Sequence, residues 1–326
     1  HNHWETLLYQ QYSKHHLVVR NLAWSADEVA LRPRAEGFGT PDEHLAFSKA
    51  DVIIAFFGFN ESFKGEAGLE QFKSDLDEWI KHTKAQDYSG KGAPRIALVS
   101  PIAAERSLAL EGRRQPITAP DPGYYDVEAL NARLEMYTNA MREVAGNHGV
   151  VFADVFTGTK QWFEAFREKQ FFTINGVHLS SVGSVNFAMM LHDALFLSVE
   201  ERMKPRSPMP INEALRLEIE AKSTLWYDRY RIVDSYYVYG GRSGLKFADG
   251  EQTNRDVMQR EREVLDVMVA NRDKRIWKLA QGEVVPAKAD DSNAPPLLSV
   301  QTSFGVNQRK DAGANTGLTS KTAEGN

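Results

Sequence analysis

The sequence predicts an α/β fold, in which a parallel sheet is covered by helices on both faces and followed by a helical extension. Up to about residue 200, short apolar runs alternate with segments of helical periodicity. These runs are apolar along their whole length, as is typical of strands buried on both faces of a sheet. Beyond about residue 210, only helical patterns recur. Strand–helix alternation over this length implies parallel strands joined by right-handed crossovers.

Four runs are predicted to be the strands of this sheet. They read "LVVR", "DVIIAFFG", "RIALVS" and "VVFADV" and occupy residues 17–20, 51–58, 95–100 and 150–155. Each run is short and rich in apolar, mostly β-branched residues, which suit a pleated and buried surface.

Apolar residues at spacings of three and four predict the helices around the sheet. A first helix is expected over residues 3–13. Two sets between the strands each form one apolar face: Leu69, Phe72, Leu76, Trp79 and Ile80; Leu130, Leu134, Tyr137, Met141 and Val144. A last helix begins after Ser180 or Ser181, either of which suits an N-cap. Its inward residues are expected to be Val182, Val185, Met189, Ala194 and Leu195.

The composition divides the chain into four parts. Residues 1–202 are predicted to form the α/β domain, and the Pro-punctuated stretch "MKPRSPMP" at 203–210 a linker. Helical patterns at 211–238 and 254–280 predict a helical hairpin within an extension at 211–281. From 282 to 326 the sequence loses its periodicity and becomes rich in polar and small residues, so disorder is expected there.

The composition also excludes several classes of function. The chain has 326 residues, a net charge of -5 and no cysteine. It therefore forms no disulfide and holds no thiolate nucleophile or Cys-ligated zinc. Basic residues are interleaved with acidic ones, which argues against a nucleic-acid partner. No apolar run approaches the length of roughly 20 residues that a membrane span needs.

Candidate functional residues follow the predicted strands. Ligands of open parallel sheets lie at the carboxyl ends of the strands. The loops at these ends read "NLAWSADEV" (21–29), "GFNESFKG" (58–65) and, beyond one more helix, "NGVHLS" (175–180). A small-residue turn, the asparagine Asn60 and the histidine His178 are therefore expected to meet at one edge of the sheet.

These three loops resemble sequence blocks of the SGNH (GDSL-type) hydrolases over roughly residues 1–200. Gly58-Phe59-Asn60 matches the Gly-x-Asn block, His178 matches the final histidine, and "WSADEV" resembles the second block with Ala26 at its usual glycine. The likeness is greatest to planctomycete-like members with helical and tail extensions. It implies a flavodoxin-like sheet and cleavage of ester bonds, with no metal or organic cofactor. His178 would be the general base, and Asn60 and the Ala26 N–H would form the oxyanion hole.

The sequence departs from the family pattern at two places. The first strand and its nucleophilic serine are expected upstream of His1, so that this fragment would itself be inactive. Asn175 occupies the position of the aspartate that orients the histidine. An amide oxygen can orient an imidazole, although it lacks a full negative charge. Asp154, at the end of the last strand, is an alternative orienting group, and it could equally cap a loop.

Simpler interpretations stay open for each of these residues. His178 could be an ordinary loop histidine, Asn60 a turn former, and Asn175-Gly176 a common turn dipeptide. Gly58 and Glu61 are assigned to substrate binding, although Glu61 could equally be a solvated neighbour of the site. His1, His3, His15 and His16 are accompanied by no acidic cluster and predict no metal site.

The resulting hypothesis is a serine esterase that removes acyl groups, acetyl among them, from a carbohydrate or another small ester. The alternative is a non-catalytic ligand-binding module that retains the pocket of the family. A third interpretation treats the C-terminal helices as a connection to another domain downstream. The chain begins His1-Asn2-His3, without a methionine or an apolar segment, so we expect a processed or partial chain and assign no compartment.

Overall fold

The computed structural model describes residues 2–35, 37–106, 126–167, 169–202, 204, 210–232, 235–248 and 250–301. The chain divides into two compact units. The first comprises residues 1–33, 40–220 and 276–283, and the second comprises residues 34–39, 221–275 and 284–326. The predicted linker at 203–210 lies almost wholly outside the described residues, and its role stays a prediction.

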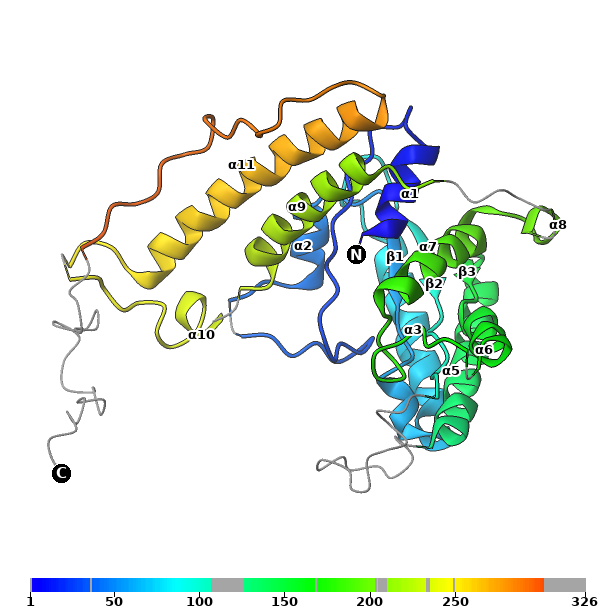
Figure 1. The fold of residues 1–326 in the computed structure, drawn as a ribbon. Helices are drawn as coiled ribbons and strands as arrows, with labels where there is room; N and C mark the ends of the chain where they lie inside the picture. Colours follow the sequence, from blue (N-terminus) through cyan, green and yellow to red (C-terminus); the bar gives the residue numbers. More distant parts are fainter. Residues whose placement is uncertain are drawn as a thin grey trace, which may run out of the picture. The chain divides into compact units, whose positions relative to one another are not determined.

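A parallel sheet forms the centre of the first unit (Figure 1). Its strands are β1 (Val52–Phe56), β2 (Arg95–Val99) and β3 (Val151–Ala153), in the order β1-β2-β3. Both pairs are parallel, with Ile54 opposite Ala97 and Leu98 opposite Phe152. Three of the four predicted strands are thereby confirmed, together with the α/β fold class.

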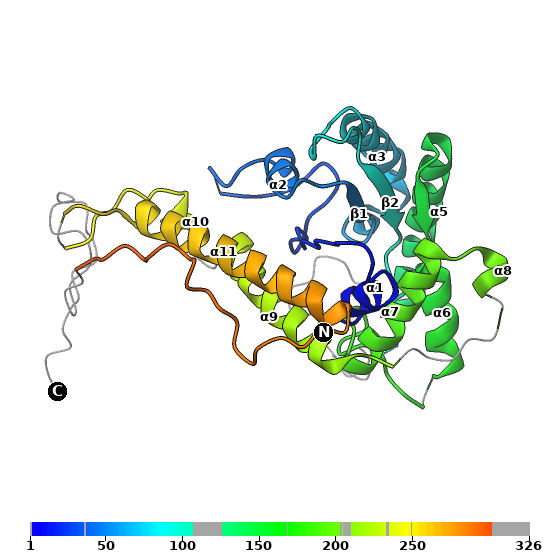
Figure 2. The same ribbon diagram turned by 90° about the horizontal axis from the view of Figure 1, so that it is seen from above.

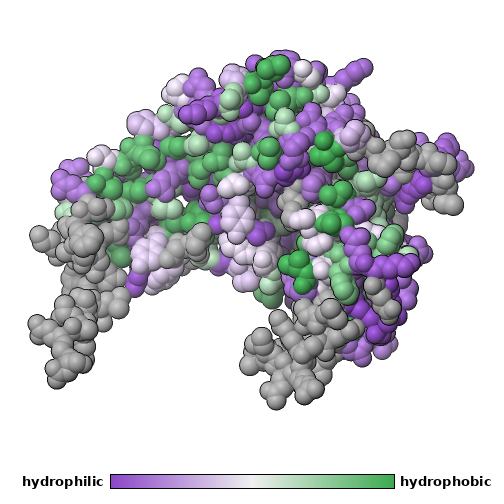
Figure 3. Space-filling model, in the orientation of Figure 1, coloured by the Kyte–Doolittle hydropathy of each residue, from purple (hydrophilic) through white to green (hydrophobic). Residues whose placement is uncertain are grey.

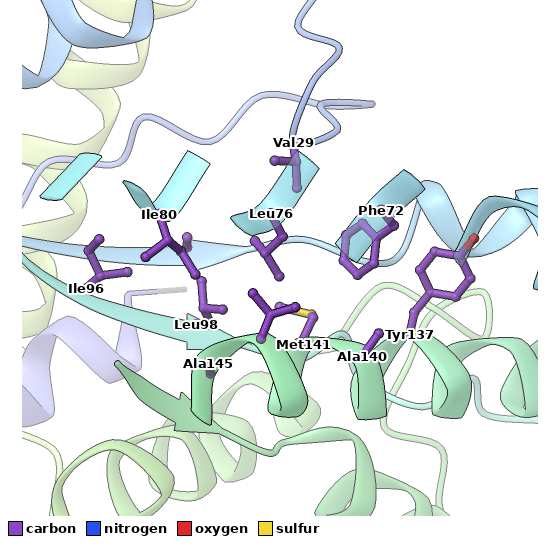
Figure 4. Close-up of a cluster of buried hydrophobic side chains, with 12 residues drawn as sticks. Val29, Phe72, Leu76, Ile80, Ile96, Leu98, Tyr137, Ala140, Met141 and Ala145 are labelled. Atoms are coloured by element: carbon purple, nitrogen blue, oxygen red, sulfur yellow. The ribbon is translucent and has the colours of Figure 1, made fainter. Parts of the chain in front are cut away.

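Helices α3 (Leu69–Lys84) and α5 (Val127–His148) cover one face of the sheet. Their predicted apolar residues meet side chains of β1 and β2 in a buried cluster (Figure 4). Leu76, Ile80, Leu98 and Met141 are all fully buried there. The periodicity of these two helices therefore predicted their inward faces correctly, because each helix has one apolar face and one charged face.

Helices α1 (His3–Gln11) and α7 (Ser181–Phe196) cover the opposite face. There Val99 and Ala153 of the sheet pack with Leu191 and Ala194 of α7, and Trp4 of α1 joins them. Alternate strand residues thus point to opposite helical layers, as the pleat requires. The predicted three-layer arrangement is confirmed.

The prediction of a strand at residues 17–20 was wrong. This segment is extended but belongs to no sheet. Leu17 and Val19 pack against the cluster around Tyr9, whose hydroxyl donates to the Leu17 carbonyl at 2.9 Å, whereas Val18 is 51% exposed. The apolar residues of this run pack against helices instead, because no strand among the described residues lies beside the segment to complete a ladder.

The predicted inward face of α7 was also partly wrong. Ser180 caps the helix as expected, accepting a hydrogen bond from Gly183 N–H at 3.1 Å. Ala194 is buried, but Val182 and Met189 are exposed, and Leu191 and His192 face inward instead. Because α7 is apolar around most of its circumference, periodicity alone does not single out one face.

The remaining elements of the first unit are short. They are α2 (Pro41–Phe47), the 3₁₀ turns η1 (Glu61–Lys64) and η2 (Glu66–Gly68), α6 (Phe156–Ala165) and α8 (Val199–Arg202). A Thr40–Glu43 capping box begins α2, in which each side chain accepts a hydrogen bond from the backbone N–H of the other residue.

Two long helices, α9 (Glu213–Tyr230) and α11 (Asn254–Ala280), form the predicted helical extension, with the short α10 (Ser235–Val238) between them. The boundary between the two units falls within both long helices. Within the second unit, Arg229 of α9 pairs with Asp266 of α11 at 2.6 Å. Hydrophobic residues reach the surface along α11 in Figure 3, in keeping with the half-buried Val257, Leu265 and Met268.

Residues 284–301 run alongside α11 as an extended segment (Figures 1 and 2). Arg272 of α11 holds Asp291 through bonds of 2.6 and 2.8 Å, and Arg260 donates to the Pro296 carbonyl at 3.2 Å. The expected disorder is therefore wrong for this stretch, because polar groups on α11 order a chain that lacks apolar periodicity. Residues 302–326 lie outside the described residues. Within the described parts of the chain, no helix is both long enough and apolar enough to cross a membrane.

Candidate active site

His178 lies in a small hairpin that leads into α7. Thr173 and Leu179 form an antiparallel bridge, and Ile174 N–H donates to the His178 carbonyl at 2.8 Å. Ile174 and His178 are therefore cross-strand neighbours on one face of the hairpin. Both are exposed, Ile174 to 67%. The imidazole thus lies at the surface beside an uncovered apolar side chain.

The side-chain oxygen of Asn175 contacts this imidazole. It accepts hydrogen bonds from His178 N–H at 3.0 Å and Val177 N–H at 3.3 Å, and it lies 3.0 Å from His178 Nδ1. Backbone N–H groups only donate, so they identify this atom as the amide oxygen. Nδ1 must then carry the ring proton of the neutral imidazole, which leaves the lone pair on Nε2. An imidazole in this tautomer is ready to act as a base at Nε2.

Asp154, the alternative orienting group, has other partners. Its carboxylate accepts hydrogen bonds from the backbone N–H of Thr157 at 2.9 Å and from its hydroxyl at 2.8 Å, and it pairs with Arg142. These contacts tie Asp154 to Thr157 in the first turn of α6 and to Arg142 of α5. The orienting contact to His178 comes from Asn175.

Gly58 and Asn60 lie directly after β1. Gly58 has φ +95°, and a Cβ there would lie 3.1 Å from the Met141 sulfur, so the turn needs glycine for its conformation and its space. Asn60 Nδ2 donates to the Asp27 carbonyl at 3.0 Å. Only one of the two Nδ2 hydrogens is used in this bond, and no other group among the described residues accepts the second, which could bind a ligand oxygen.

The same hydrogen bond joins Asn60 to the loop that carries Ala26. Ala26 has φ +64°, in the left-handed region that favours glycine. A glycine, which the resembled sequence block usually has at this position, would adopt this conformation without strain. Alanine adopts the same turn with some strain. Ala26 is exposed, and its N–H is bonded to no other group among the described residues. Two N–H donors, from Ala26 and Asn60, thus belong to adjoining segments.

Glu61 connects these two segments through hydrogen bonds of its buried carboxylate. It is 4% exposed, and its carboxylate accepts hydrogen bonds from Val29 N–H and Gly58 N–H, both at 2.9 Å. Burial raises the pKa of this carboxyl, and the two backbone donors oppose that shift. A substrate-binding role for Glu61 stays a prediction, because both of its oxygens are engaged by backbone.

Glu105 binds the His178 hairpin in the same way that Glu61 binds the other two loops, through a buried carboxylate. It follows β2 and is 4% exposed. Its carboxylate accepts hydrogen bonds from Phe172 N–H and Thr173 N–H, and its own N–H donates to the Gly176 carbonyl at 2.8 Å. The sequence analysis missed Glu105, Thr173 and Ile174. Periodicity carries no signal for them, because Glu105 lies in the segment beyond the end of β2 at Val99, and Thr173 and Ile174 lie in a short hairpin between helices.

Both halves of the candidate site lie at the carboxyl edge of the sheet. The Gly58–Asn60 turn follows β1, and the His178 hairpin is attached through Glu105 to the segment after β2. Phe59, next to Asn60, and Val177, next to His178, pack against the same buried apolar cluster. A hollow of about 90 Å³ adjoins the first half, lined by Asp27, Phe56, Phe57, Phe59, Asn60, Glu61 and Pro101.

Other features of the surface offer less chemistry. A wider hollow of about 560 Å³ is lined by residues of α5 and α6, among them Glu135 and Lys160, and by none of the predicted site residues. Within the described residues, no group of three or more His, Asp or Glu side chains is placed to hold a metal ion. No described side chain is hydrogen-bonded to His178 Nε2.

Comparison with known proteins shows a matching family. Residues 1–184, more than half of the chain, match the family described as GDSL-like lipase/acylhydrolase. The chain belongs to this family. Its members are hydrolases acting on esters, so the arrangement around Asn60 and His178 lies within a family of ester-cleaving enzymes.

One solved structure also matches part of the chain. It is a catalytic mutant of Axe2, an acetylxylan esterase from Geobacillus stearothermophilus, with 15% sequence identity and a TM-score of 0.32. The match covers 49% of this chain and 64% of that one, so less than two thirds of the esterase is spanned. A comparison with curated proteins finds no match.

Proposed function

We propose that this member of the GDSL-like family is a serine ester hydrolase in which His178 is the general base. The observation that carries the proposal is the bond from His178 Nδ1–H to the Asn175 oxygen, which leaves Nε2 free to accept a proton. Ala26 N–H and Asn60 Nδ2 are the donors that would stabilise an oxyanion. Each of them has a hydrogen available beyond its contacts within the described residues.

The reaction would proceed in two halves. A serine Oγ attacks the ester carbonyl as its proton passes to His178 Nε2, and the carbonyl oxygen becomes an oxyanion. Ala26 N–H and Asn60 Nδ2 donate to that oxygen, and losing one such donor typically costs about 2.7–4 kcal/mol of transition-state stabilisation. Collapse expels the alcohol, which takes the proton from Nε2. Water then attacks the acyl-enzyme as its proton passes to His178 Nε2, the carboxylic acid leaves, and the proton returns from Nε2 to the serine Oγ.

The acyl group in this proposal is short. The hollow beside Asn60 measures about 90 Å³, which suits an acetyl group better than a long chain, and three phenylalanines and a proline supply the apolar part of its lining. The alcohol would be a carbohydrate or another small molecule.

We propose that the nucleophilic serine comes from a strand upstream of residue 1. The Asp51 carbonyl accepts from Arg95 N–H, so in a pleated strand the backbone groups of Val52, Ile54 and Phe56 point away from β2. Val52 and Phe56 are 44% and 51% exposed. A parallel strand docked at this edge would end beside Asn60 and carry a serine toward the site. Residues 1–326 alone would then be inactive.

A non-catalytic binding module is the second candidate. It is favoured by the amide at Asn175, which offers the imidazolium no full charge, and by the absence of a described hydroxyl on His178 Nε2. Hydrolysis of p-nitrophenyl acetate separates the two functions when it is measured on the protein with its upstream segment.

Turnover that is lost in His178→Ala and kept in His82→Ala supports the hydrolase. His82 is a matched control because it is exposed and pairs with Asp42 away from these loops. No turnover in the extended wild-type protein supports the binding module. Turnover by residues 1–326 alone would contradict an upstream serine.

A further inference from the structure

We propose that Glu105 is a positioning residue for His178: its buried carboxylate, acting through Thr173, sets the hairpin that directs the imidazole. The inference rests on the proposed function only in taking His178 as the base. Glu105 itself touches no reacting atom, since it lies beneath the hairpin and is 4% exposed.

The contacts of Glu105 concentrate on one short segment. Its Oε1 accepts from Phe172 N–H at 2.9 Å, and its Oε2 accepts from Thr173 N–H at 2.7 Å and from the Thr173 hydroxyl at 2.6 Å. Its own N–H donates to the Gly176 carbonyl at 2.8 Å. A single residue after β2 thus binds the first arm and the turn of a hairpin that begins 67 positions further along the chain.

A chain of hydrogen bonds leads from this carboxylate toward the imidazole. The Thr173 hydroxyl donates to Glu105 and accepts from Gly176 N–H at 3.0 Å. Gly176 is the neighbour of Asn175, whose oxygen binds His178. Because Glu105 binds the hydroxyl hydrogen, the hydroxyl oxygen faces Gly176 as an acceptor. The turn between Thr173 and Gly176 is thereby defined, and with it the place of the Asn175 side chain.

The chemistry of a carboxylate suits this role better than that of other side chains. An ionised carboxyl only accepts hydrogen bonds, so it can serve two backbone donors and a hydroxyl together. A glutamine would offer one acceptor oxygen and would point its NH₂ group at an N–H donor. A buried charge is costly and is weak evidence of a stabilising role, so a positional role accounts better for an acid at this place.

The test measures the tautomer of His178 by ¹⁵N NMR of the histidine-labelled protein. The signal is assigned among the nine histidines by its loss in His178→Gln. In the wild-type protein we expect mainly the Nδ1–H tautomer. In Glu105→Ala the ratio of Nδ1–H to Nε2–H should fall by about twofold to tenfold, as losing an ordinary hydrogen bond implies. Glu128→Ala, which removes an exposed acid paired with Arg106, should leave the ratio unchanged.

A second pair of variants keeps the proposal testable if Glu105→Ala fails to fold. Thr173→Val preserves the branched shape but removes the hydroxyl, and it should lower the ratio. Thr173→Ser retains the hydroxyl and should restore the wild-type ratio. A folded Glu105→Ala, or a Thr173→Val, with the wild-type tautomer would overturn the inference. Because this readout needs no turnover, a chain without esterase activity could still confirm the role of Glu105, and an active chain could still refute it.

Discussion

The side-chain oxygen of Asn175 lies 3.0 Å from both the backbone nitrogen and the ring Nδ1 of His178. One oxygen therefore holds the backbone of the turn and the imidazole in a fixed relation. An amide is sufficient for this orientation, since it needs only an acceptor. It differs from a carboxylate in offering no negative charge to the imidazolium that forms during ester cleavage.

We expect Asn175→Asp to raise kcat/KM of the enzymatically competent protein by about fivefold. Hydrogen bonds to charged groups are worth roughly 1 kcal/mol more than neutral ones, and the imidazolium is present only after proton transfer. Steady-state kinetics with p-nitrophenyl acetate provides the measurement. Asn175→Ala is the companion variant and should lower kcat/KM, and a lower kcat/KM in Asn175→Asp would speak against the orienting role.

Ala26→Gly should stabilise the protein by about 1 kcal/mol. Ala26 has φ +64°, a conformation that costs a residue with a Cβ roughly 1–2 kcal/mol, whereas glycine adopts it freely. Urea denaturation of both proteins measures the difference. Ala23→Gly is the matched control in the same loop. Since Ala23 is not among the residues with positive φ, its change to glycine should have the opposite sign.

Gly58→Ala should destabilise the protein by about 1–3 kcal/mol and disturb the Asn60 side chain. The alanine would have to adopt φ +95°, and its Cβ would lie 3.1 Å from the Met141 sulfur. Gly146→Ala in α5 is the control, because a Cβ there meets nothing within 4 Å and alanine is the better helix former. Equal losses of stability in the two variants would rule out a special requirement at Gly58.

Glu61 should make the protein less stable as pH rises. Burial raises the pKa of its carboxyl in the folded chain. Between the unfolded value of about 4.3 and the higher folded value, the folded state holds the proton more often, so the stabilising contribution is lost as pH rises. Unfolding free energies of wild type and Glu61→Gln, measured from pH 4 to 8, test this. The advantage of wild type over the variant should shrink with increasing pH, and a constant difference would refute the effect.

The contribution of Asp291 to the stability of the second unit should have the opposite pH dependence: it should increase as pH rises. The guanidinium of Arg272 holds the pKa of this carboxyl below its ordinary value. Its contribution is therefore complete above about pH 4 and is lost as pH falls through the folded value. Asp291→Ala should release residues 284–301 from α11 and speed their cleavage by a protease at neutral pH. Glu283→Ala, at an exposed position nearby in the sequence, should leave cleavage unchanged.

Local pattern was sufficient for much of the fold. Residues 51–58, 95–100 and 150–155 are continuous apolar runs, and each forms a strand of the sheet. The periodicity of α3 and α5 identified Leu76 and Met141 as core residues, because each helix is apolar on one face only. Pattern failed for residues 17–20 and for the inward face of α7. In both cases the missing information was the identity of the neighbouring element.

Motif order alone was enough to select the candidate site residues: Asn60 follows a strand, Asn175 and His178 precede a helix, and Ala26 lies in the loop that follows the first helix, in the family's order of blocks. Their partners became known from the folded structure, which has Asn175 rather than Asp154 at the imidazole and Asp27 at Asn60. It also revealed the two buried acids, Glu61 and Glu105, that hold the loops. The physical reason is that a hydrogen bond depends on distances between segments far apart in the chain, which local periodicity does not encode.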